Sequence, residues 1–520
     1  MTKEKEEAAF DVVVVGYGFA GAATACAAAD GGARVLLIEK TARGGGISIC
    51  SAGGVRIAKD AEEAFRYLVE TNAGTAPEEN LRALAHGMAT VADRIKAYAA
   101  ESRATVSVDW VAGNYPFPGH DTFGFASVAD VPGLDFHAEW PHVRGLRAGA
   151  RLYKVMTECV KRRGVEVRFG TRAKRLVRNP DGAIAGVVIE SAGAETTVRA
   201  SGGVILACGG FEGDERMKSQ YWQEKPVLPG AFRGNTGDGI RMAQDVGADL
   251  WHMWHFHGTY GFRHTDPGYP FGIRLFRLPD WLPGAEYDDR EAIPFFSASR
   301  ERRMPWILVD RTGRRFANEY HPYMQDTGHR WMEPFDPVTQ TYPRIPSWMI
   351  VDEAARKAFP LGFPTYNDPD VSYEWSVDNS REIANGILMQ ADSVEGMAAK
   401  MEADPAILAA TIDRWNAMCR DGKDAEFGRL PDTMMPIERP PFTFGRVWPL
   451  VANTQGGPVH DAGQRVLDVF GAPIPGLYSA GEIGSLFGHL YLSGGNLAEC
   501  FVGGDIAGRA AAVRARSHPK

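Results

Sequence analysis

Residues 11–39 read DVVVVGYGFAGAATACAAADGGARVLLIE, and this stretch decides the fold. The four valines are β-branched and lie between turn residues, which is typical of a parallel strand buried on both faces. Phe19 to Asp30 is alanine-rich and is followed by two glycines, a pattern that predicts a helix and its end. Arg34 to Ile38 repeats the strand composition. The stretch therefore predicts a βαβ unit of about 30 residues.

This unit has the features of a dinucleotide-binding site. Gly16 allows a tight turn, Gly18 has no Cβ to block a pyrophosphate, and Gly21 lets the helix pack closely on the strand. Glu39 ends the second strand, where a carboxylate can accept the hydroxyls of an adenosine ribose. We favour this interpretation over a glycine turn in an unrelated α/β protein, because the glycines stand between a predicted strand and a predicted helix.

The composition is that of an ordinary globular enzyme. A chain of 520 residues is long for one core, so we expect two lobes. A net charge of −8 gives no basic footprint, which argues against a nucleic-acid partner. No stretch approaches the ~18 apolar residues of a membrane span, and the charged first residues contain no apolar signal region, so we expect a cytoplasmic location. Six scattered cysteines without a C-x-x-C pair predict buried thiols.

Several further segments suit a bound nucleotide. Residues 41–54 contain five glycines among small hydroxyl residues, so their backbone can approach a flat ring or a phosphate. Residues 207–211 (ACGGF) and 476–482 (GLYSAGE) place glycines after predicted strands. In residues 235–240 (NTGDGI), glycines surround an acid before a predicted helix.

Other elements follow from periodicity and turn residues. Residues 61–100 have helical spacing, and strands are predicted at 165–169, 183–190 and 204–207, with a turn at 179–182. A small-residue helix is expected from Asn496, and its N-terminus suits a negative or carbonyl-like oxygen.

Two segments carry open alternatives. The aromatic segment from Trp110 to Trp140 either lines an apolar pocket or forms an irregular packed loop. Residues 251–444 lose the glycine motifs and gain proline and tryptophan, which indicates an inserted lobe. This lobe contains four histidines, which we interpret as packed or pocket-lining rather than metal ligands, because no acid or cysteine accompanies them: His252, His255, His257 and His264.

The glycine motifs follow one another along the chain in the same order as in the fumarate reductase/succinate dehydrogenase flavoprotein superfamily, which the chain resembles over nearly its whole length. They are Gly16/Gly18/Gly21 with Glu39, the loop 41–54, ACGGF (207–211), TGDGI (236–240), GLYSAGE (476–482) and GGN (494–496). The resemblance implies an α/β fold, with a Rossmann-like FAD-binding lobe built from both chain ends (1–248 and 446–520) and an inserted α+β catalytic capping lobe (249–445). Members with covalently bound flavin carry a histidine in the stretch corresponding to residues 44–54. This chain has none there, so noncovalent FAD is expected.

Two departures from the fumarate reductases are informative. Those enzymes carry a proton-delivering arginine where this chain has Tyr323, and a carboxylate-binding arginine near what is Leu492 or Ser493 here. At both places this chain resembles the 3-ketosteroid dehydrogenases. Those enzymes share the motif N-E-x-x-P-Y, which ends at Tyr323 in this chain, and the motif G-H-x-Y, which ends here at Tyr491. The pair Tyr491 and Ser493 is more similar to the Δ4-type than to the Δ1-type dehydrogenases.

The resemblance implies a dehydrogenase that desaturates a cyclic or steroid-like ketone to an enone. Tyr491 and the backbone N–H of Gly495 would stabilise the enolate oxygen, Tyr323 would take the α-proton, and the β-hydride would pass to flavin N5. Ser493 would orient Tyr491 or join the proton relay, and Tyr115 and Tyr320 are reserve tyrosines. A tyrosine base needs help to lose its proton, for which three residues are candidates: Arg314, Arg315 and His321.

The expected FAD contacts come from all of the glycine motifs and their neighbours. They are Gly16, Gly18, Ala20, Gly21, Glu39, Lys40, Gly45, Gly46, Ser48, Ala52, Gly53, Gly54, Ala173, Ala207, Gly209, Gly210, Asp238, Gly239, Gly481, Glu482, Asn496 and Leu497.

Two other functions remain open. One is a flavin-dependent ene-reductase acting on an enone or an unsaturated acid, and the other is a flavin-binding assembly subunit without its own turnover. A ketone dehydrogenase would use an apolar small-molecule ketone and a diffusible electron acceptor, whereas a reductase needs an electron supply for which the chain shows no haem motif or second flavin domain.

Overall fold

The computed structural model describes residues 5–6, 9–143, 147–275, 304–320, 323–358, 360–364, 370–371 and 373–517. The chain divides into two compact units. Unit 1 comprises Met1–Tyr221, Phe232–Phe256 and Asn453–Lys520, and unit 2 comprises Trp222–Ala231 and His257–Ala452.

The main sheet of unit 1 is mostly parallel. Its central strands lie in the order β21 (Arg465–Leu467), β22 (Pro473–Ser479), β10 (Ala194–Leu206), β2 (Phe10–Val15), β3 (Val35–Ile38), β7 (Glu166–Arg168). Val12, Val13 and Val14 of β2 are fully buried, as expected for a strand covered on both faces. β2 pairs in parallel with β3 and β10, so the predicted βαβ unit is confirmed.

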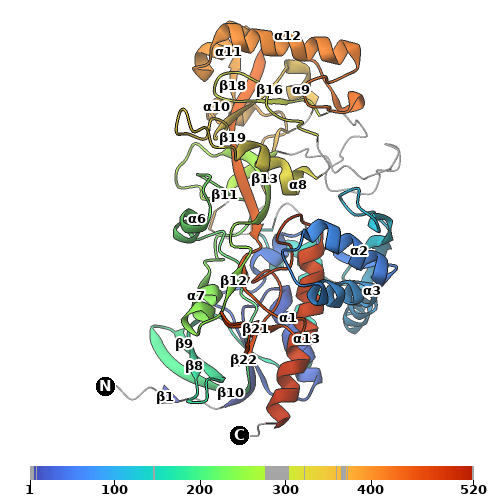
Figure 1. The fold of residues 1–520 in the computed structure, drawn as a ribbon, viewed down its shortest axis with the longest axis vertical. Coiled ribbons are helices and arrows are strands. Elements are labelled where there is room, and N and C mark those ends of the chain that lie inside the picture. Colours follow the sequence, from blue (N-terminus) through green and yellow to red (C-terminus); the bar gives the residue numbers. More distant parts are fainter. Residues whose placement is uncertain are drawn as a thin grey trace. The chain divides into compact units, whose positions relative to one another are not determined.

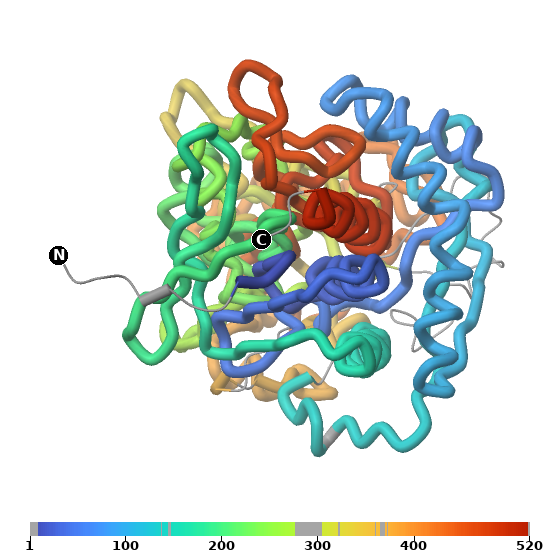
Figure 2. The backbone as a smooth tube through the Cα atoms, turned by 90° about the horizontal axis from the view of Figure 1, so that it is seen from below, coloured from blue at the N-terminus to red at the C-terminus, as the bar shows by residue number. Residues whose placement is uncertain are grey.

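Helices α1 (Phe19–Asp30) and α13 (Gly495–Ser517) pack against each other, although they lie near opposite ends of the chain (Figure 2). A Cβ on Gly508 would lie 2.4 Å from the Thr24 carbonyl oxygen, so this close approach requires glycine. The bounds of α1 are those predicted from the alanine-rich segment. Gly16 has φ +102°, a conformation that suits the predicted tight turn before this helix.

Three further strands belong to this sheet: β1 (Lys5–Glu6) and β9 (Ile184–Ser191) pair with β10, and β8 (Thr171–Arg178) pairs with β9. Unit 1 also contains the three-stranded sheet β4 (Val55–Ala58), β6 (Phe123–Asp130) and β5 (Thr105–Asp109), and the pair β12 (Leu250–Trp251) and β20 (Gly457–Pro458). The helices are α2 (Ala61–Asn72), α3 (Glu78–Glu101), α4 (Phe136–Glu139), α5 (Ala148–Arg162), α6 (Glu215–Tyr221) and α7 (Asp238–Asp245), with short 3₁₀ turns at Gly46–Cys50 and His120–Thr122.

The predicted helical region 61–100 is two helices rather than one. Ala73 ends α2 in a left-handed conformation with φ +52°, and Pro77 precedes α3. The predicted turn at 179–182 is present, since the Gly182 N–H donates to the Asn179 carbonyl at 2.9 Å.

Unit 2 is built on a sheet against which two hydrophobic cores pack. Ile307 and Val309 of β15 belong to one core, and Leu308 between them belongs to the other, which is the alternation expected of a strand. The strand order is β15 (Ile307–Val309), β16 (Ser347–Val351), β19 (Phe442–Thr454), β13 (Phe256–Arg263), β14 (Gly272–Leu275), β17 (Gly362–Phe363), with β11 (Leu228–Pro229) and β18 (Met389–Ala391) beside β19. Strands β13, β16, β18 and β19 of this sheet are labelled in Figure 1.

Side chains of two helices, α11 (Val394–Met401) and α12 (Pro405–Asp421), form part of one of these cores. The helices of unit 2 are α8 (Met324–Thr327), α9 (Glu353–Ala358), α10 (Ser380–Ala384), α11 (Val394–Met401) and α12 (Pro405–Asp421), with 3₁₀ turns at Gly328–Met332 and Pro431–Thr433. Among the residues that the structure describes, no helix is long and apolar enough to cross a membrane.

Candidate active site

The glycine motifs of unit 1 meet around the carboxyl ends of β2, β10 and β22. A Cβ on Gly16 would lie 2.5 Å from the Ala207 carbonyl oxygen, and one on Gly481 would lie 2.8 Å from the Ala20 Cβ. A Cβ on Gly239 would lie 2.4 Å from the Cys208 sulfur. The structure thus brings together the predicted cofactor motifs of residues 16–21, 207–211, 237–239 and 481.

Glu39 and Ser48 flank the first turn of α1. The Glu39 carboxylate accepts the Tyr17 N–H at 3.1 Å and the Thr41 N–H at 2.9 Å. Ser48 Oγ accepts the Phe19 N–H at 3.0 Å, so a residue of the glycine-rich loop satisfies a donor at the start of the helix. Gly45, also in that loop, donates its N–H to the Tyr17 carbonyl at 2.8 Å.

The rest of the glycine-rich loop is also tightly packed. A Cβ on Gly53 would lie 2.4 Å from the backbone of Ala148, and one on Gly54 would lie 3.0 Å from the Phe125 ring. Gly46 begins a 3₁₀ turn with φ +46°. Ala52, the remaining predicted contact of this loop, is half-buried.

Lys40 and Asp238, both predicted cofactor residues, form an ion pair. Lys40 Nζ lies 3.0 Å from Asp238 Oδ2 and donates to Thr236 Oγ1 at 2.8 Å, and Arg172 donates to Asp238 Oδ1 at 2.7 Å. Burial raises the pKa of Asp238, but Arg172 and Lys40 outweigh it and hold the pKa below its usual value. Ala173, the neighbour of Arg172, is buried in β8.

Glu482 belongs to a buried carboxyl pair with Glu212, a residue that the sequence did not single out. Asn235 Nδ2 donates to Glu212 Oε1 at 2.7 Å and to Glu482 Oε2 at 3.3 Å. Burial and the charge of Glu482 raise the pKa of Glu212 well above its usual value, and burial raises the pKa of Glu482 to about 7. Gly209 lies against Asn235 and Gly210 lies against Thr454 and Glu482, because a Cβ on either glycine would clash with these side chains.

The side chain of Asn496 lies in a polar network at the start of α13. It accepts a hydrogen bond from Asn453 at 3.0 Å and donates to Glu499 at 2.9 Å and to Gln455 at 3.0 Å. Leu497, the next predicted cofactor residue, is half-buried in the first turn of the helix.

The residues of unit 1 fit a dinucleotide cofactor. A left-handed glycine turn, the first turn of α1 and an acid at the end of the second strand occur together, as such a cofactor requires. The positions where a Cβ would clash belong to the same motifs.

Tyr491 is the best-defined candidate for a catalytic group in unit 1. Its side chain is buried, and its ring packs edge-on against Phe487 with centroids 5.3 Å apart. Burial raises the pKa of Tyr491, and backbone hydrogen bonding at Asn496 and Gly494 lowers it in part. A phenol with a raised pKa keeps its proton at neutral pH, so the setting suits a donor to a carbonyl oxygen.

The neighbours of Tyr491 are ordered by the same turn. The Gly495 N–H donates to the Leu492 carbonyl at 2.7 Å. Ser493 receives the Asn114 side chain, whose Oδ1 accepts the Ser493 N–H at 2.9 Å. Tyr115, next in the chain, is buried and donates its N–H to the Tyr67 hydroxyl at 3.0 Å. The structure therefore brings the segment of Tyr115 to that of Ser493, through a residue that the sequence analysis did not name.

Tyr323 lies in unit 2 at the start of α8. Its side chain is buried, and its ring stacks on the ring of His257 with centroids 6.1 Å apart. His257 is half-buried on β13. Tyr320, a reserve candidate, is buried in one of the two cores of unit 2.

The three residues proposed to help Tyr323 lose its proton differ in their surroundings. His321 lies outside the described residues. Arg314 is exposed and donates to Thr312 Oγ1 at 3.0 Å. Arg315 is buried and lies 2.6 Å from Glu319 and 2.8 Å from Asp424.

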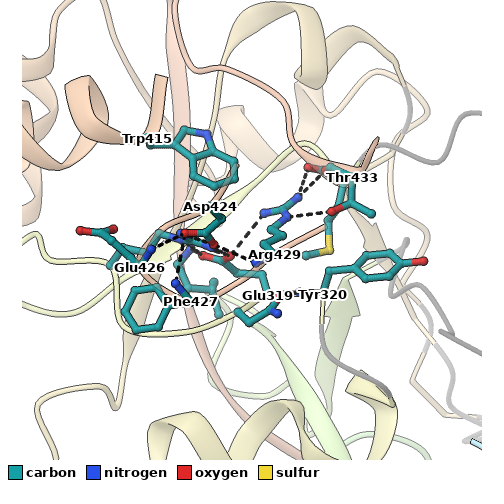
Figure 3. Close-up of polar contacts among 12 residues, drawn as sticks. Glu319, Tyr320, Trp415, Asp424, Glu426, Phe427, Arg429 and Thr433 are labelled. Carbon is teal, nitrogen blue, oxygen red and sulfur yellow. Dashed lines mark hydrogen bonds and ion pairs between the residues drawn. The ribbon is translucent and has the colours of Figure 1, made fainter. Parts of the chain in front are cut away.

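Arg315 belongs to an arginine–carboxylate network, made up of Arg315, Glu319, Asp424 and Arg429. Figure 3 labels Glu319, Asp424 and Arg429 of this network. Arg429 NH1 lies 3.3 Å from Glu319, and the Arg315 guanidinium lies 4.5 Å from the centroid of the Trp415 ring. Such a network holds buried charges in pairs, and we assign it a structural role.

Two histidines of the WHMWHFH segment, His252 and His255, bond to backbone carbonyls. His252 Nδ1 lies 2.7 Å from the Ser485 carbonyl, and His255 Nδ1 lies 2.7 Å from the Phe487 carbonyl. Within the described residues, no group of three or more histidine, cysteine or acidic side chains is arranged to hold a metal ion.

Sequence reasoning missed Arg56, Asn114 and Glu212. A signal existed for Arg56, a lone arginine in the apolar run VRIA directly after the glycine-rich loop. Asn114 and Glu212 stand in segments whose general role was recognised, but no spacing singles them out.

With the geometry in place, the family follows from the sequence match. The FAD binding domain family matches residues 11–264 and 278–497. The chain belongs to this family. It is an FAD-dependent oxidoreductase, and the predicted cofactor and fold class are confirmed.

Three relatives illustrate the range of this oxidoreductase family. The digoxin reductase of Eggerthella lenta is 28% identical, covering 96% of this chain and 86% of the relative. A 3-oxosteroid 1-dehydrogenase of Mycobacterium tuberculosis is 27% identical, covering 93% of this chain and 94% of the relative. A cytochrome-type fumarate reductase of Shewanella frigidimarina is 26% identical, covering 96% of this chain and 77% of the relative.

Solved structures share the fold. The 3-ketosteroid Δ1-dehydrogenase of Sterolibacterium denitrificans matches with a TM-score of 0.77 at 23% identity, covering 98% of this chain and all of the other. The 3-ketosteroid Δ4-(5α)-dehydrogenase of Rhodococcus jostii matches with a TM-score of 0.67 at 22% identity, covering 98% of both chains. Both dehydrogenase types therefore have this fold. The predicted flavoprotein family is confirmed by the family match itself.

Proposed function

We propose that this FAD-dependent oxidoreductase desaturates a cyclic or steroid-like ketone next to its carbonyl and releases the conjugated enone. The observation that carries the proposal is the buried side chain of Tyr491, packed edge-on against Phe487 and followed by the turn that the Gly495 N–H closes onto the Leu492 carbonyl. A phenol in this setting is suited to hold a carbonyl oxygen while negative charge develops on it.

Removal of the α-proton is the difficult step, because an α-C–H is only weakly acidic. Tyr491 Oη would donate to the carbonyl oxygen together with the Gly495 N–H, which would exchange its bond to the Leu492 carbonyl for the substrate. Ser493 would orient Tyr491. The hydrogen bond from each donor to the substrate oxygen strengthens as the enolate forms. This lowers the barrier to removal of the α-proton and does more than tighten substrate binding.

Tyr323 would take the α-proton. The ring of His257 lies beside it in unit 2, whereas Arg315 is already paired with carboxylates, so we favour His257 as its modulating neighbour. When bound, FAD supplies the acceptor for the hydrogen and electron pair that leave the β-carbon. A diffusible electron acceptor would then carry the two electrons away.

The lobes and the cofactor linkage complete the proposal. Residues 1–248 and 446–520 would bind FAD, and residues 249–445 would cap the substrate. FAD would be held noncovalently, because residues 44–54 contain no histidine. The Δ4-like pair Tyr491 and Ser493 favours desaturation at the Δ4 rather than the Δ1 position.

The decisive experiment mixes the purified FAD-loaded protein with saturated ketones in the absence of oxygen. The panel runs from cyclohexanones to 3-ketosteroids, and the readout is loss of the oxidised-flavin absorbance. We expect at least one ketone to bleach the flavin. Tyr491→Phe, which removes one donor to the oxygen, should slow bleaching by about a hundredfold. Tyr323→Phe should slow it at least as much, because it removes the base.

Matched tyrosines provide the controls. Tyr260 is buried in unit 2 and accepts a hydrogen bond from Trp306, and Tyr98 is buried in unit 1. Tyr260→Phe and Tyr98→Phe should leave the bleaching rate within a few-fold of the unaltered protein. If no ketone bleaches the flavin, or if the control variants fall as far as the two catalytic ones, the proposal is wrong.

The second candidate is an ene-reductase, which the reductases among the relatives favour. A dicarboxylate substrate is disfavoured, because Tyr323 occupies the position at which fumarate reductases carry the proton-delivering arginine. Rapid reoxidation of the dithionite-reduced protein by enones or fumarate, with no bleaching by ketones, would establish the reductase instead.

A further inference from the structure

Arg56 is a buried arginine of unit 1 that neither the motifs nor the proposed chemistry uses. It lies in β4 between Val55 and Ile57, and its side chain has no exposed surface. The guanidinium lies 4.1 Å from the centroid of the Phe125 ring. A buried cation is costly unless it is well bonded, so its partners indicate what holds it there.

Its donors reach the turn that precedes α13 and the aromatic segment. Arg56 Nε donates to the Ser493 carbonyl at 2.7 Å, NH1 donates to the Val111 carbonyl at 2.9 Å, and NH2 donates to Asn114 Oδ1 at 3.4 Å. The backbone N–H of Arg56 also donates to the Gly494 carbonyl at 3.2 Å.

Asn114 completes the arrangement. Its Oδ1 accepts the Ser493 N–H at 2.9 Å, so Arg56 holds the carbonyl of Ser493 and Asn114 holds its N–H. Gly494 has φ +74°, and a Cβ there would lie 2.6 Å from the Gly54 carbonyl oxygen. The turn from Ser493 to Gly495 is therefore fixed by side-chain bonds and by close packing.

The charge of Arg56 also acts on Tyr491. Burial raises the pKa of the Tyr491 hydroxyl, the charge of Glu499 raises it further, and the charge of Arg56 lowers it. An arginine stays charged over the whole working pH range, and in a buried setting its field is weakly screened. A positive charge that favours the tyrosinate also favours an enolate bound in the same place.

We propose that Arg56 is a positioning residue of the oxygen-binding site, which holds the 493–495 turn and places a buried positive charge behind it. This rests on the proposed role of Tyr491 and Gly495 as donors to the substrate oxygen. The negative charge that develops on that oxygen is then stabilised from behind by Arg56, which does not touch the substrate.

The test measures the stabilisation of an oxyanion without turnover. The probe is 2-naphthol, whose ionised form resembles an enolate, bound to the FAD-loaded protein and titrated by ultraviolet difference absorbance. The unaltered protein should lower the apparent pKa of the bound naphthol. Arg56→Met should raise that pKa by about one unit or more relative to the unaltered protein and reduce kcat at least tenfold, with a smaller change in KM.

Three variants separate charge from position. Arg56→Lys keeps the charge but not the planar fork, so it should retain most of the naphthol shift and still lose rate. Asn114→Ala loosens the turn and leaves the charge, and it should behave in the same way. Glu499→Gln removes the opposing negative charge that Glu499 carries above its pKa of about 7, and it should lower the apparent pKa of the bound naphthol in that alkaline range.

The outcomes are distinct. If Arg56→Met binds FAD normally and leaves both the naphthol pKa and kcat unchanged, the inference is wrong. If that variant fails to fold, Arg56→Lys decides, because unaltered rate in the lysine variant would overturn the positioning role. Failure of the unaltered protein to bind 2-naphthol or to lower its pKa would also overturn the inference. Arg56-dependent naphthol ionisation without bleaching by any ketone would retain the oxygen site and reject ketone dehydrogenation.

Discussion

Both units bury carboxyl groups, but they surround them differently. In unit 1, Glu212 and Glu482 meet each other and Asn235, and burial raises the pKa of both. In unit 2, burial raises the pKa of Asp424, but the charge and hydrogen bond of Arg315 and the backbone N–H groups of Phe427 and Arg429 together outweigh burial and lower it. The difference teaches that burial alone does not set the charge state. The partner does, and the two units should therefore respond to pH in opposite directions.

The largest effect is expected from breaking the arginine–carboxylate network of unit 2. Arg429→Met leaves the buried Glu319 with one arginine fewer and should cost about 3–5 kcal/mol of unfolding free energy. Calorimetric unfolding measures this loss. Arg420, which pairs with Glu438 on the surface, is the matched control, and Arg420→Met should cost less than about 1 kcal/mol. Equal losses in the two variants would contradict the assigned role of the network.

A second prediction concerns Glu499 of unit 1, whose pKa burial raises from 4.5 to about 7. Between these two values the folded state holds a proton that the unfolded state releases, so stability is greatest below pH 4.5 and falls as pH rises to about 7. Glu499→Gln should remove about 3 kcal/mol of this pH dependence. Unfolding in urea at a series of pH values checks it, and an unchanged slope would show that Glu499 is already ionised when folded.

Asp424 of unit 2 should show the opposite sign. Its lowered pKa contributes stability above the usual aspartate pKa, and this contribution is lost as the pH falls through the folded pKa. Asp424→Asn should cost about 2 kcal/mol at neutral pH, because it weakens the pairing of Arg315, and little at strongly acid pH. Acid unfolding followed by intrinsic fluorescence measures the difference. A loss that is the same at every pH would count against the ion pair.

The smallest effect sharpens the comparison, because exposed carboxylates should not distinguish the units. Asp60 caps α2 in unit 1, and Asp404 caps α12 in unit 2, each accepting two backbone N–H groups. Asp60→Ala and Asp404→Ala should each cost about 1 kcal/mol. Thermal unfolding checks the pair. A much larger loss in one unit would mean that something other than burial and partners separates the two.

The first strand, helix and turn of the chain could be predicted because their signals are local. The alanine-rich segment predicted the bounds of α1, and the turn before it requires a positive φ that glycine adopts readily, as Gly16 does. The convergence of residues 207–211, 237–239 and 481 on that turn was expected from the family resemblance, since no local pattern encodes it.

The environment of the site residues was beyond the sequence. The sequence could not show that Arg315, unlike Arg314, is buried and paired with carboxylates, because its partner Asp424 is far away in the sequence. The carboxyl pair was missed for the same reason, since Glu212 and Glu482 approach each other only after the sheet has formed. Long-range pairs of this kind depend on the tertiary fold rather than on spacing.

The composition of unit 1 from both chain ends has a consequence for biosynthesis. β22 pairs with β10, and α13 packs on α1, so the sheet that carries the cofactor motifs lacks a central strand until residues 473–517 have left the ribosome. The strands of unit 2 emerge earlier and can pair among themselves during translation. FAD should therefore be captured only after residues 473–517 have emerged, and the supply of free FAD at that moment would decide how much newly made protein becomes active.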